Sequence, residues 1–175
     1  MSDKDNFIEF VITIPDEESA KIAYENKARQ THGVLIDIVL AAENFIILSS
    51  PYLKDLKTVN PTLNGALLSA LKKGIKLHIL STDKSFDLAN LSQYNSSGIF
   101  LYKPNTTRGE RLINSHAKFF MSDGKQVYLG SANFTIAGLN HNIEMGVYAI
   151  GNLAKQVESF WEYLLENRYI VSQKL

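Results

Sequence analysis

The sequence predicts an α/β fold, in which a mixed, largely parallel central sheet is flanked by helices on both faces. Two successive helix-then-strand units, over residues 31–50 and 60–80, are typical of parallel strands joined by helices. The length of 175 residues is enough to bury one hydrophobic core. We therefore expect one domain over residues 1–175, in which residues 1–30 supply an N-terminal strand and a charged segment.

The first part of the chain alternates between strand and helix patterns. Residues 7–14 (FIEFVITI) are rich in β-branched and aromatic side chains and end before a proline, as a strand does. The charged residues 16–30 contain few apolar positions, so a helix there can bury only a narrow stripe. Apolar residues then recur at helical spacing over 31–42, and residues 45–50 (FIILSS) follow as a short buried strand.

The second helix-then-strand unit has the clearest boundaries. Asn60 can cap a helix, Pro61 suits its first turn, and Gly74 can end it in a left-handed conformation. Residues 75–80 (IKLHIL) then predict a strand, and the polar residues 81–98 leave room for one short helix.

The rest of the chain predicts further strands and a closing helix. The strands are expected over 99–102, 117–121, 126–129 and 142–150, and the middle two form a hairpin around an Asp-Gly pair. The closing helix starts at Asn152, and the apolar residues that share one of its faces are expected to pack in the core: Leu153, Val157, Phe160, Trp161 and Leu164.

Composition excludes several kinds of site. The chain has no cysteine, so disulfides, thiolate metal sites and cysteine nucleophiles are excluded, and a reducing, cytoplasmic location is expected. The sequence shows neither a signal-peptide pattern nor an apolar run of about 18 residues that would span a bilayer. Eighteen basic and eighteen acidic side chains balance, so any binding of nucleic acid must use a local basic patch.

One stretch, residues 116–133, gathers the side chains that a phosphate site needs. His116 and Lys118 are two apart on a predicted strand, so both are expected on the same face. After the next strand, Gly130 allows close backbone approach, and Ser131 and Asn133 can donate hydrogen bonds to phosphate oxygens. Histidine suits both attack on phosphorus and proton transfer at neutral pH. Together these residue types predict cleavage of a phosphodiester.

This stretch resembles the phospholipase D superfamily, whose signature is His-x-Lys-x4-Asp-x6-Gly-Ser-x-Asn. The sequence contains every specified position, at His116, Lys118, Asp123, Gly130, Ser131 and Asn133. The superfamily also carries an acidic residue a short distance after the asparagine, where this chain has Glu144. The resemblance implies a phospholipase D-like fold. Other members carry two copies of the motif and this chain carries one, which implies a homodimer with one motif from each subunit in a shared site.

The resemblance also implies a two-step mechanism that requires no metal or other cofactor. His116 of one subunit would attack phosphorus to form a phosphohistidine, while His116 of the other subunit would protonate the leaving oxygen and then activate water. Lys118, Ser131 and Asn133 would hold the non-bridging oxygens. Glu144 would orient a histidine and stabilise its charge, because a carboxylate bonded to imidazole fixes the tautomer that leaves the attacking nitrogen free.

Several residues have structural interpretations. Asp123 begins the Asp-Gly turn, so we expect it to fix the hairpin rather than to take part in the chemistry. Ser131, taken alone, could instead cap a short helix over 134–137. The histidines outside the motif are expected to serve packing or solvation: His32, His78 and His141. Four basic residues are either solvated surface or nucleic-acid contacts: Lys103, Arg108, Arg111 and Lys125.

Three functions are consistent with the sequence. The leading interpretation is a metal-independent endonuclease acting on DNA or RNA, because the compact single-motif members of the superfamily look most like nucleases. The first alternative is a phospholipase or phosphatidyl transferase, which is disfavoured because the chain offers no amphipathic apolar segment to dock on a lipid surface. The second alternative is a non-catalytic nucleic-acid-binding or assembly module, for instance a subunit of a larger defence or repair complex.

Overall fold

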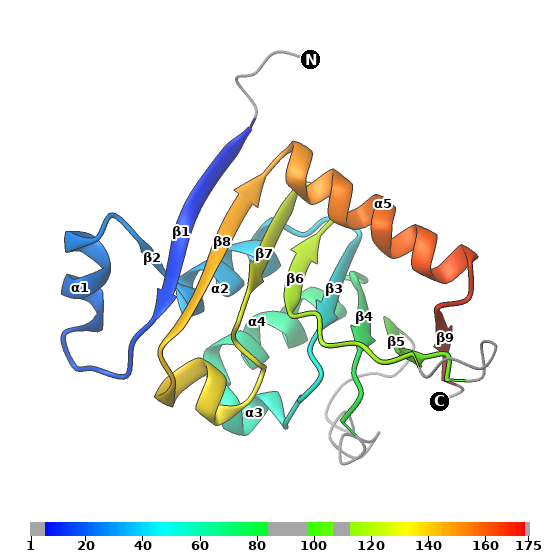
Figure 1. Cartoon of the computed structure of the whole chain (residues 1–175), viewed down its shortest axis with the longest axis horizontal. Coiled ribbons are helices and arrows are strands. Elements are labelled where there is room, and N and C mark those ends of the chain that lie inside the picture. The colour runs from blue at the N-terminus through cyan, green and yellow to red at the C-terminus, as the bar shows by residue number, and fades with distance from the viewer. Residues whose placement is uncertain (1–5, 84–97, 107–112, 174–175) are drawn as a thin grey trace.

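Nine strands form one sheet in this computed structural model, which describes residues 6–83, 98–106 and 113–173. The strands are β1 (Phe7–Thr13), β2 (Arg29–Gln30), β3 (Phe45–Ser49), β4 (Lys76–Leu80), β5 (Ile99–Pro104), β6 (Phe119–Ser122), β7 (Gln126–Gly130), β8 (Glu144–Ile150) and β9 (Ile170–Ser172). Their order is β2-β1-β8-β7-β6-β3-β4-β5-β9, from left to right in Figure 1. The short strands β2 and β9 are not among those that the sequence predicts, whereas each longer strand is found where a strand is expected.

The helices are α1 (Ser19–Glu25), α2 (Thr31–Ala41), α3 (Leu56–Val59), α4 (Pro61–Lys72), the π-helix η4 (Ala137–His141) and α5 (Asn152–Glu166). Helix α4 has the predicted boundaries. The Asn60 side chain accepts a hydrogen bond from the Leu63 N–H at 3.0 Å, Pro61 lies in the first turn, and Gly74 adopts a left-handed φ of 88° after the last turn. The short helix expected within 81–98 falls on residues 84–97, outside the described residues.

The sheet has two halves that differ in strand direction. In the first, which we call the parallel half, β3, β4 and β5 are parallel neighbours. In the second, the antiparallel half, β6, β7, β8 and β1 pair antiparallel with one another, and β6 also pairs antiparallel with β3. The predicted mixed sheet is therefore confirmed. It is largely parallel only in the half that helix-then-strand units build. In the other half, hairpin connections reverse the chain direction.

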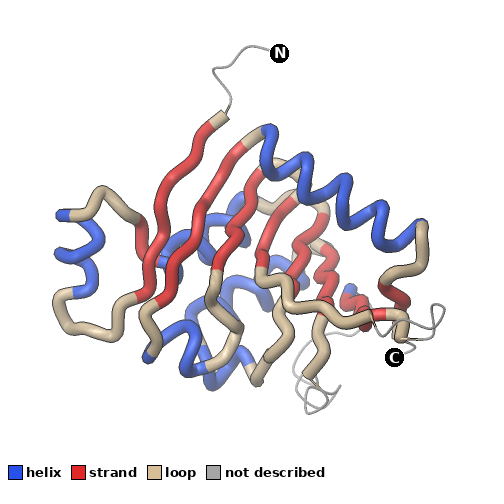
Figure 2. The backbone as a smooth tube through the Cα atoms, viewed as in Figure 1, coloured by secondary structure: helices blue, strands red, loops and turns tan. Residues whose placement is uncertain are grey.

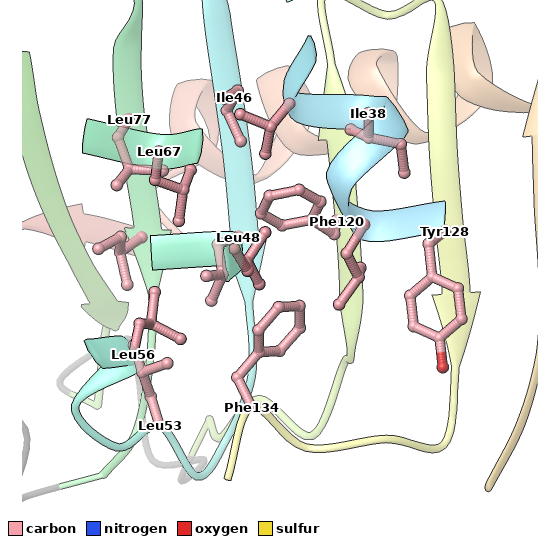
Figure 3. Close-up of a cluster of buried hydrophobic side chains, with 14 of the residues drawn as sticks. Ile38, Ile46, Leu48, Leu53, Leu56, Leu67, Leu77, Phe120, Tyr128 and Phe134 are labelled. Carbon is pink, nitrogen blue, oxygen red and sulfur yellow. The ribbon is translucent and has the colours of Figure 1, made fainter. Parts of the chain in front are cut away.

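Side chains alternate between two hydrophobic clusters along the central strands. Ile46 and Leu48 of β3 pack with Phe120 of β6 beneath α2, α3 and α4, and Figure 3 shows this cluster. Ile47, between them in β3, points to the opposite face and joins the cluster that contains Trp161 of α5. The prediction of helices on both faces of the sheet is thus confirmed, with α5 alone on one face in Figure 1.

Helix α5 buries a face that is rotated from the predicted one. Trp161 is only 4% exposed, as expected, but Phe160 is 60% exposed, so the prediction that Phe160 packs in the core is wrong. Ala154 is fully buried. It lies on the same face of α5 as Trp161, on the side away from Phe160. Phe160 instead stacks on Tyr163, with ring centroids 6.5 Å apart.

Within the described part of the chain, no helix combines the length and apolar character that crossing a membrane needs.

Candidate active site

The predicted site residues meet at one edge of the sheet. They come from three adjacent positions: His116 and Lys118 just before β6, Ser131 and Asn133 just after β7, and Glu144 at the start of β8. Because β6, β7 and β8 are antiparallel neighbours, the start of β6, the end of β7 and the start of β8 lie at the same edge. We call this the lower edge, as it is drawn in Figure 1, and Figure 2 shows the strands giving way to loops there.

His116 and Lys118 contact each other directly. Lys118 Nζ lies 2.9 Å from His116 Nδ1 and also donates to the backbone oxygen of His116 at 3.1 Å. An ammonium group can only donate hydrogen bonds. This contact therefore forms with the tautomer in which His116 Nδ1 carries no proton.

The segment that carries His116 and Lys118 precedes the strand in which the sequence places it. β6 begins one residue after Lys118, so the expectation that His116 and Lys118 lie on a strand is wrong. The Lys118 carbonyl still accepts the Gly130 N–H at 3.2 Å, as in a ladder. The Ser49 hydroxyl donates to the carbonyl of Ala117 at 3.0 Å. A side-chain bond thus holds the histidine segment against the end of β3, and it takes the place of regular strand pairing.

Burial and a carboxylate act in opposite directions on the Lys118 ammonium. Partial burial lowers the pKa of Lys118, and the Glu144 carboxylate raises it by a smaller amount, so that the pKa lies below its ordinary value. The site therefore holds a partly desolvated cation beside a histidine. In such surroundings a cation interacts more strongly with charge on phosphate oxygens than it does in water.

Glu144 is held by two neutral donors. The Ser131 hydroxyl donates to Glu144 Oε2, and the Asn142 side-chain N–H donates to Glu144 Oε1 at 3.0 Å. Ser131 Oγ also accepts the Met145 N–H at 3.1 Å, and this bond holds the serine against the backbone at the start of β8. The Glu144 side chain is nearly buried, with 8% exposure. This network fixes the position of a carboxylate at the lower edge, since both of its oxygens are oriented.

The residues around Ser131 are packed too tightly for a larger side chain. A Cβ atom at Gly130 would lie 2.2 Å from the Tyr128 hydroxyl oxygen and 3.0 Å from the Met145 carbonyl. Burial raises the pKa of this Tyr128 to about 12, so the phenol beneath the glycine stays protonated.

Ser131 does not cap the helix that follows, because η4 begins at Ala137 with no side-chain cap. Its hydroxyl serves Glu144 instead.

Asn133 contacts Ser50 at the end of β3. Ser50 is 1% exposed, and its oxygen lies 3.4 Å from Asn133 Oδ1. The same oxygen accepts the Phe134 N–H at 3.2 Å, and its hydroxyl donates to the Tyr52 carbonyl at 2.6 Å. Ser50 has one hydroxyl proton, and the shorter distance assigns it to the Tyr52 carbonyl, so Ser50 contacts Asn133 without donating to it.

The sequence reasoning missed Ser50 and Asn142 as supporting residues. Asn142 stands two residues before Glu144, and this spacing is the only signal in the sequence that links them. Ser50 follows a buried strand at its carboxyl end, where ligand sites of parallel sheets form. The general position was therefore visible in the sequence, but the contact with Asn133 joins residues that are distant along the chain.

Asp123 lies at the other end of β6 from His116. Its carboxylate accepts the backbone N–H groups of Glu43, Asn44 and Phe45, at distances of 2.6, 2.9 and 2.8 Å. Asp123 thereby ties the hairpin turn to the loop between α2 and β3. Lys125 in the same turn pairs with Glu43 at 2.5 Å. Both residues are remote from the lower edge, so the turn of the motif has a structural role, and Lys125 is not positioned to contact a substrate there.

The remaining candidate residues have varied positions. Lys103 is exposed near the end of β5, at the lower edge, while Arg108 and Arg111 fall outside the described residues. His32 Nε2 contacts the Leu139 carbonyl oxygen at 2.6 Å. Burial, with a smaller effect of Lys76, lowers the pKa of His78 to about 4. No three histidine or acidic side chains in the described ranges are grouped as metal ligands would be.

Two pockets flank the motif residues along the lower edge. The first, which we call the β1 pocket, has a volume of about 450 Å3 and is lined by the end of β1, the start of α2, η4 and residues that include Asp16 and Glu17. The second, which we call the β5 pocket, has a volume of about 750 Å3 and is lined by the ends of β4 and β5 together with Tyr52, Lys103 and Asn114. The strand order places one pocket on each side of β6, β7 and β8.

Residues 35–165 match the protein-family model described as "Cardiolipin synthase, PLD-like domain". Among curated proteins, the chain is similar to "DISARM protein DrmC" of Bacillus paralicheniformis, with 25% identity over 169 residues. The similarity covers 93% of this chain and 65% of that protein, so the chain spans less than two thirds of the relative's length.

Solved structures share the fold. Nuc, a phospholipase D family member from Salmonella typhimurium, has a TM-score of 0.65 and 21% identity, covering 98% of this chain and 100% of Nuc. NucT from Helicobacter pylori has a TM-score of 0.64 and 18% identity, covering 95% and 100%. Phosphatidylserine synthase from Haemophilus influenzae Rd KW20 has a TM-score of 0.66 and 13% identity, covering 97% of this chain but 40% of the synthase. At these identities the similarity concerns the fold.

Proposed function

The chain belongs to the phospholipase D superfamily of phosphodiesterases, and we propose that it is a nuclease whose active site is completed by a second copy of the chain. The observation that carries this proposal is the convergence of His116, Lys118 and the Ser131–Glu144 pair at one open edge of the sheet. A nucleophile, a cation and oriented neutral donors around one point suit a phosphorus centre that gains charge.

The contacts within one chain support a shared site. Attack by His116 Nε2 requires the ring proton on Nδ1, and a carboxylate is the usual partner that holds it there. In the described residues, His116 Nδ1 meets Lys118, whereas Glu144 is bonded to Ser131 and Asn142, so no hydrogen bond joins His116 to Glu144. A second copy supplies the missing pairing, with Glu144 of one subunit orienting His116 of the other.

Exposed apolar side chains around the half-site also support a covering subunit. Ile143 is 75% exposed, Met145 is 60% exposed and Ile136 is 41% exposed. Ile143 and Met145 directly flank Glu144 in the sequence, so these side chains border the polar network. Apolar residues rimming a polar site are costly in water and are stabilised by contact with a second protein surface.

The reaction then proceeds in two displacements. Nε2 of one His116 attacks phosphorus, a P–N bond forms, the P–O bond to the leaving group breaks, and the partner subunit's His116 donates its proton to the leaving oxygen. The partner subunit's His116 next takes a proton from water, whose oxygen attacks phosphorus and releases the first histidine. Lys118 and Asn133 hold the non-bridging oxygens in both steps.

The full-length matches to Nuc and NucT and the lining of the β5 pocket support nucleic acid as the substrate, whereas the family model and one of the solved structures carry the names of lipid synthases. Nuc and NucT cover nearly all of this chain and are themselves covered completely. The β5 pocket beside the motif contains charged and polar side chains such as Lys103 and Asn114. Such walls match a nucleotide, which carries polar groups along its whole length, better than an acyl chain.

One assay tests this function. The protein is incubated in excess chelator with plasmid DNA, single-stranded DNA and RNA oligonucleotides, and micellar phosphatidylcholine. We expect chelator-resistant cleavage of nucleic acid, which His116→Ala abolishes. Release of choline without cleavage of nucleic acid would instead assign the lipid function. Retention of DNA on a gel without cleavage of either substrate would assign a binding module.

The shared site is tested by mixing wild-type protein with the His116→Ala variant and co-refolding the two. If each active dimer needs both copies of His116, an equal mixture retains about one quarter of the activity of wild type alone, because only wild-type pairs are competent. Independent subunits would retain about one half. Size-exclusion chromatography of the same mixtures checks that dimers form.

A further inference from the structure

The β5 pocket adjoins the candidate active site through the chain itself. Asn114, in its wall, precedes His116 by two residues, and Tyr52, on its other side, follows Ser50 by two residues. Ser50 is the residue that contacts Asn133 at the end of β3. Anything bound in this pocket therefore lies beside the position that the substrate phosphate takes in the proposed site.

The lining of the β5 pocket combines apolar walls with a polar, aromatic rim. Ile79 and Leu101 form part of the wall, and both are buried. The Tyr52 ring at the rim is 55% exposed. The Asn114 side-chain oxygen accepts the Ser115 N–H at 2.9 Å, so the side chain presents its NH2 donors to a ligand. A pocket lined by both an aromatic ring and an amide donor suits a flat heterocycle that carries acceptors, such as a nucleobase.

The two pockets differ in charge. The β5 pocket includes Lys103 near the end of β5, together with Asp83, whose carboxylate pairs with Lys54 at 3.1 Å. The β1 pocket includes Asp16 and Glu17 and no lysine or arginine among its described lining residues. A phosphate-linked chain is attracted toward the first pocket and repelled by the second. The substrate strand is therefore expected to extend from the scissile phosphate of each subunit toward the β5 pocket.

We propose that the β5 pocket is a nucleotide subsite for single-stranded nucleic acid, in which Tyr52 stacks on the base next to the scissile phosphate and Lys103 contacts the backbone. This proposal rests on the proposed nuclease function. The volume of about 750 Å3 is in the range of small-molecule sites and accommodates a nucleotide. A base in a duplex is paired and stacked, so it reaches such a pocket only if the strand is single or locally opened.

The test compares Tyr52→Ala with Tyr52→Phe, which keeps the ring and removes only the hydroxyl. Tyr24→Ala is the matched control, because Tyr24 is 84% exposed on α1 and lines neither pocket. Each protein is assayed on a fluorescent single-stranded oligonucleotide, the same sequence as a paired hairpin, and ethyl p-nitrophenyl phosphate, a small phosphodiester without a base.

We expect wild type to cut the single strand faster than the hairpin. Tyr52→Ala should lower the ratio of oligonucleotide to small-diester kcat/KM by about tenfold, the loss expected for one base stack. Tyr52→Phe and Tyr24→Ala should keep the wild-type ratio. An unchanged ratio in Tyr52→Ala, or an equal loss in Tyr52→Phe, overturns the subsite while leaving the nuclease function intact. Cleavage of the small diester without cleavage of any nucleic acid overturns the proposed function itself.

Discussion

The two halves of the sheet contribute to the lower edge in different ways. In the antiparallel half, β6, β7 and β8 are close in sequence, so one stretch and Glu144 bring His116, Lys118 and Ser131 together. In the parallel half, helices separate the strands, so Tyr52 and Lys103 meet at the same pocket from distant parts of the chain. Chemistry confined to a short stretch is visible as a motif, whereas a binding surface assembled from distant loops is visible only in the fold.

Within the antiparallel half, the largest effect apart from the loss of His116 is expected for Glu144→Gln. The substitution keeps the shape but removes the charge that fixes and stabilises a histidine, so kcat should fall about 10²- to 10⁴-fold. Asn142→Ala removes only one of the two donors to the carboxylate and should have a smaller effect. Steady-state kinetics of both variants, with circular dichroism to check folding, measure the difference. Equal losses of kcat in the two variants would show that the hydrogen bond from Asn142 matters as much as the charge of the Glu144 carboxylate.

A second prediction separates the two ends of β6. Asp123→Asn removes a charged acceptor of three backbone N–H groups, so the free energy of unfolding should fall by about 2 kcal/mol. Activity per folded molecule should stay at the wild-type level, because the carboxylate is remote from His116. Urea denaturation gives the stability, and activity normalised to the folded fraction gives the second quantity. A large loss of normalised activity would place Asp123 in the chemistry.

A third prediction contrasts two lysines that the sequence grouped together. Lys103 lines the β5 pocket in the parallel half, and Lys125 lies at the far end of β6. Lys103→Ala should raise the KM for an oligonucleotide several-fold and reduce the salt slope of binding by about 1. Lys125→Ala should change neither quantity. Fluorescence anisotropy over a range of salt concentrations measures both variants, and identical slopes would contradict the asymmetry of the two positions.

The smallest effect concerns His78 of the parallel half. Burial holds its pKa at about 4 in the folded protein, below the ordinary value of 6.5. The unfolded chain therefore binds a proton on this residue between about pH 6.5 and 4 while the folded protein does not, and stability should fall as the pH falls through this window. His78→Phe should show a weaker decline over this range than wild type. Thermal unfolding at several pH values measures it, with His141→Phe, at an exposed position, as the control.

The same contrast explains how much the sequence could predict. Hydrophobic periodicity located the main strands and helices, and caps such as Asn60 were found at the predicted residue because they depend on local contacts. The hairpin of β6 and β7 was predicted from its Asp-Gly turn and is confirmed. The antiparallel pairing of β8 with β7 and with β1 was not predicted, because such pairing is decided by tertiary contacts. Phe160 was assigned to the wrong face, since the helix rotates to bury Ala154 and Trp161.

For the candidate site, the sequence identified side chains and not their partners. The motif named Ser131 as a phosphate donor, but in the structure its hydroxyl is directed to Glu144. The spacing of His116 and Lys118 did predict that they lie together, although in the segment before β6 and not in the strand. Ser50 and Tyr52 could not be connected to the site because they reach it only when β3 pairs with β6.

The placement of Asp123 opposite His116 has a consequence for large-scale mutagenesis. A scan that reads only activity would record losses at both the aspartate and the histidine, because loss of folded protein and loss of chemistry both remove signal. A parallel read-out of cellular abundance would separate them: substitutions at Asp123 deplete the protein, whereas substitutions at His116 leave it abundant and inactive. The motif would then divide into an architectural end and a chemical end, joined by the length of one strand.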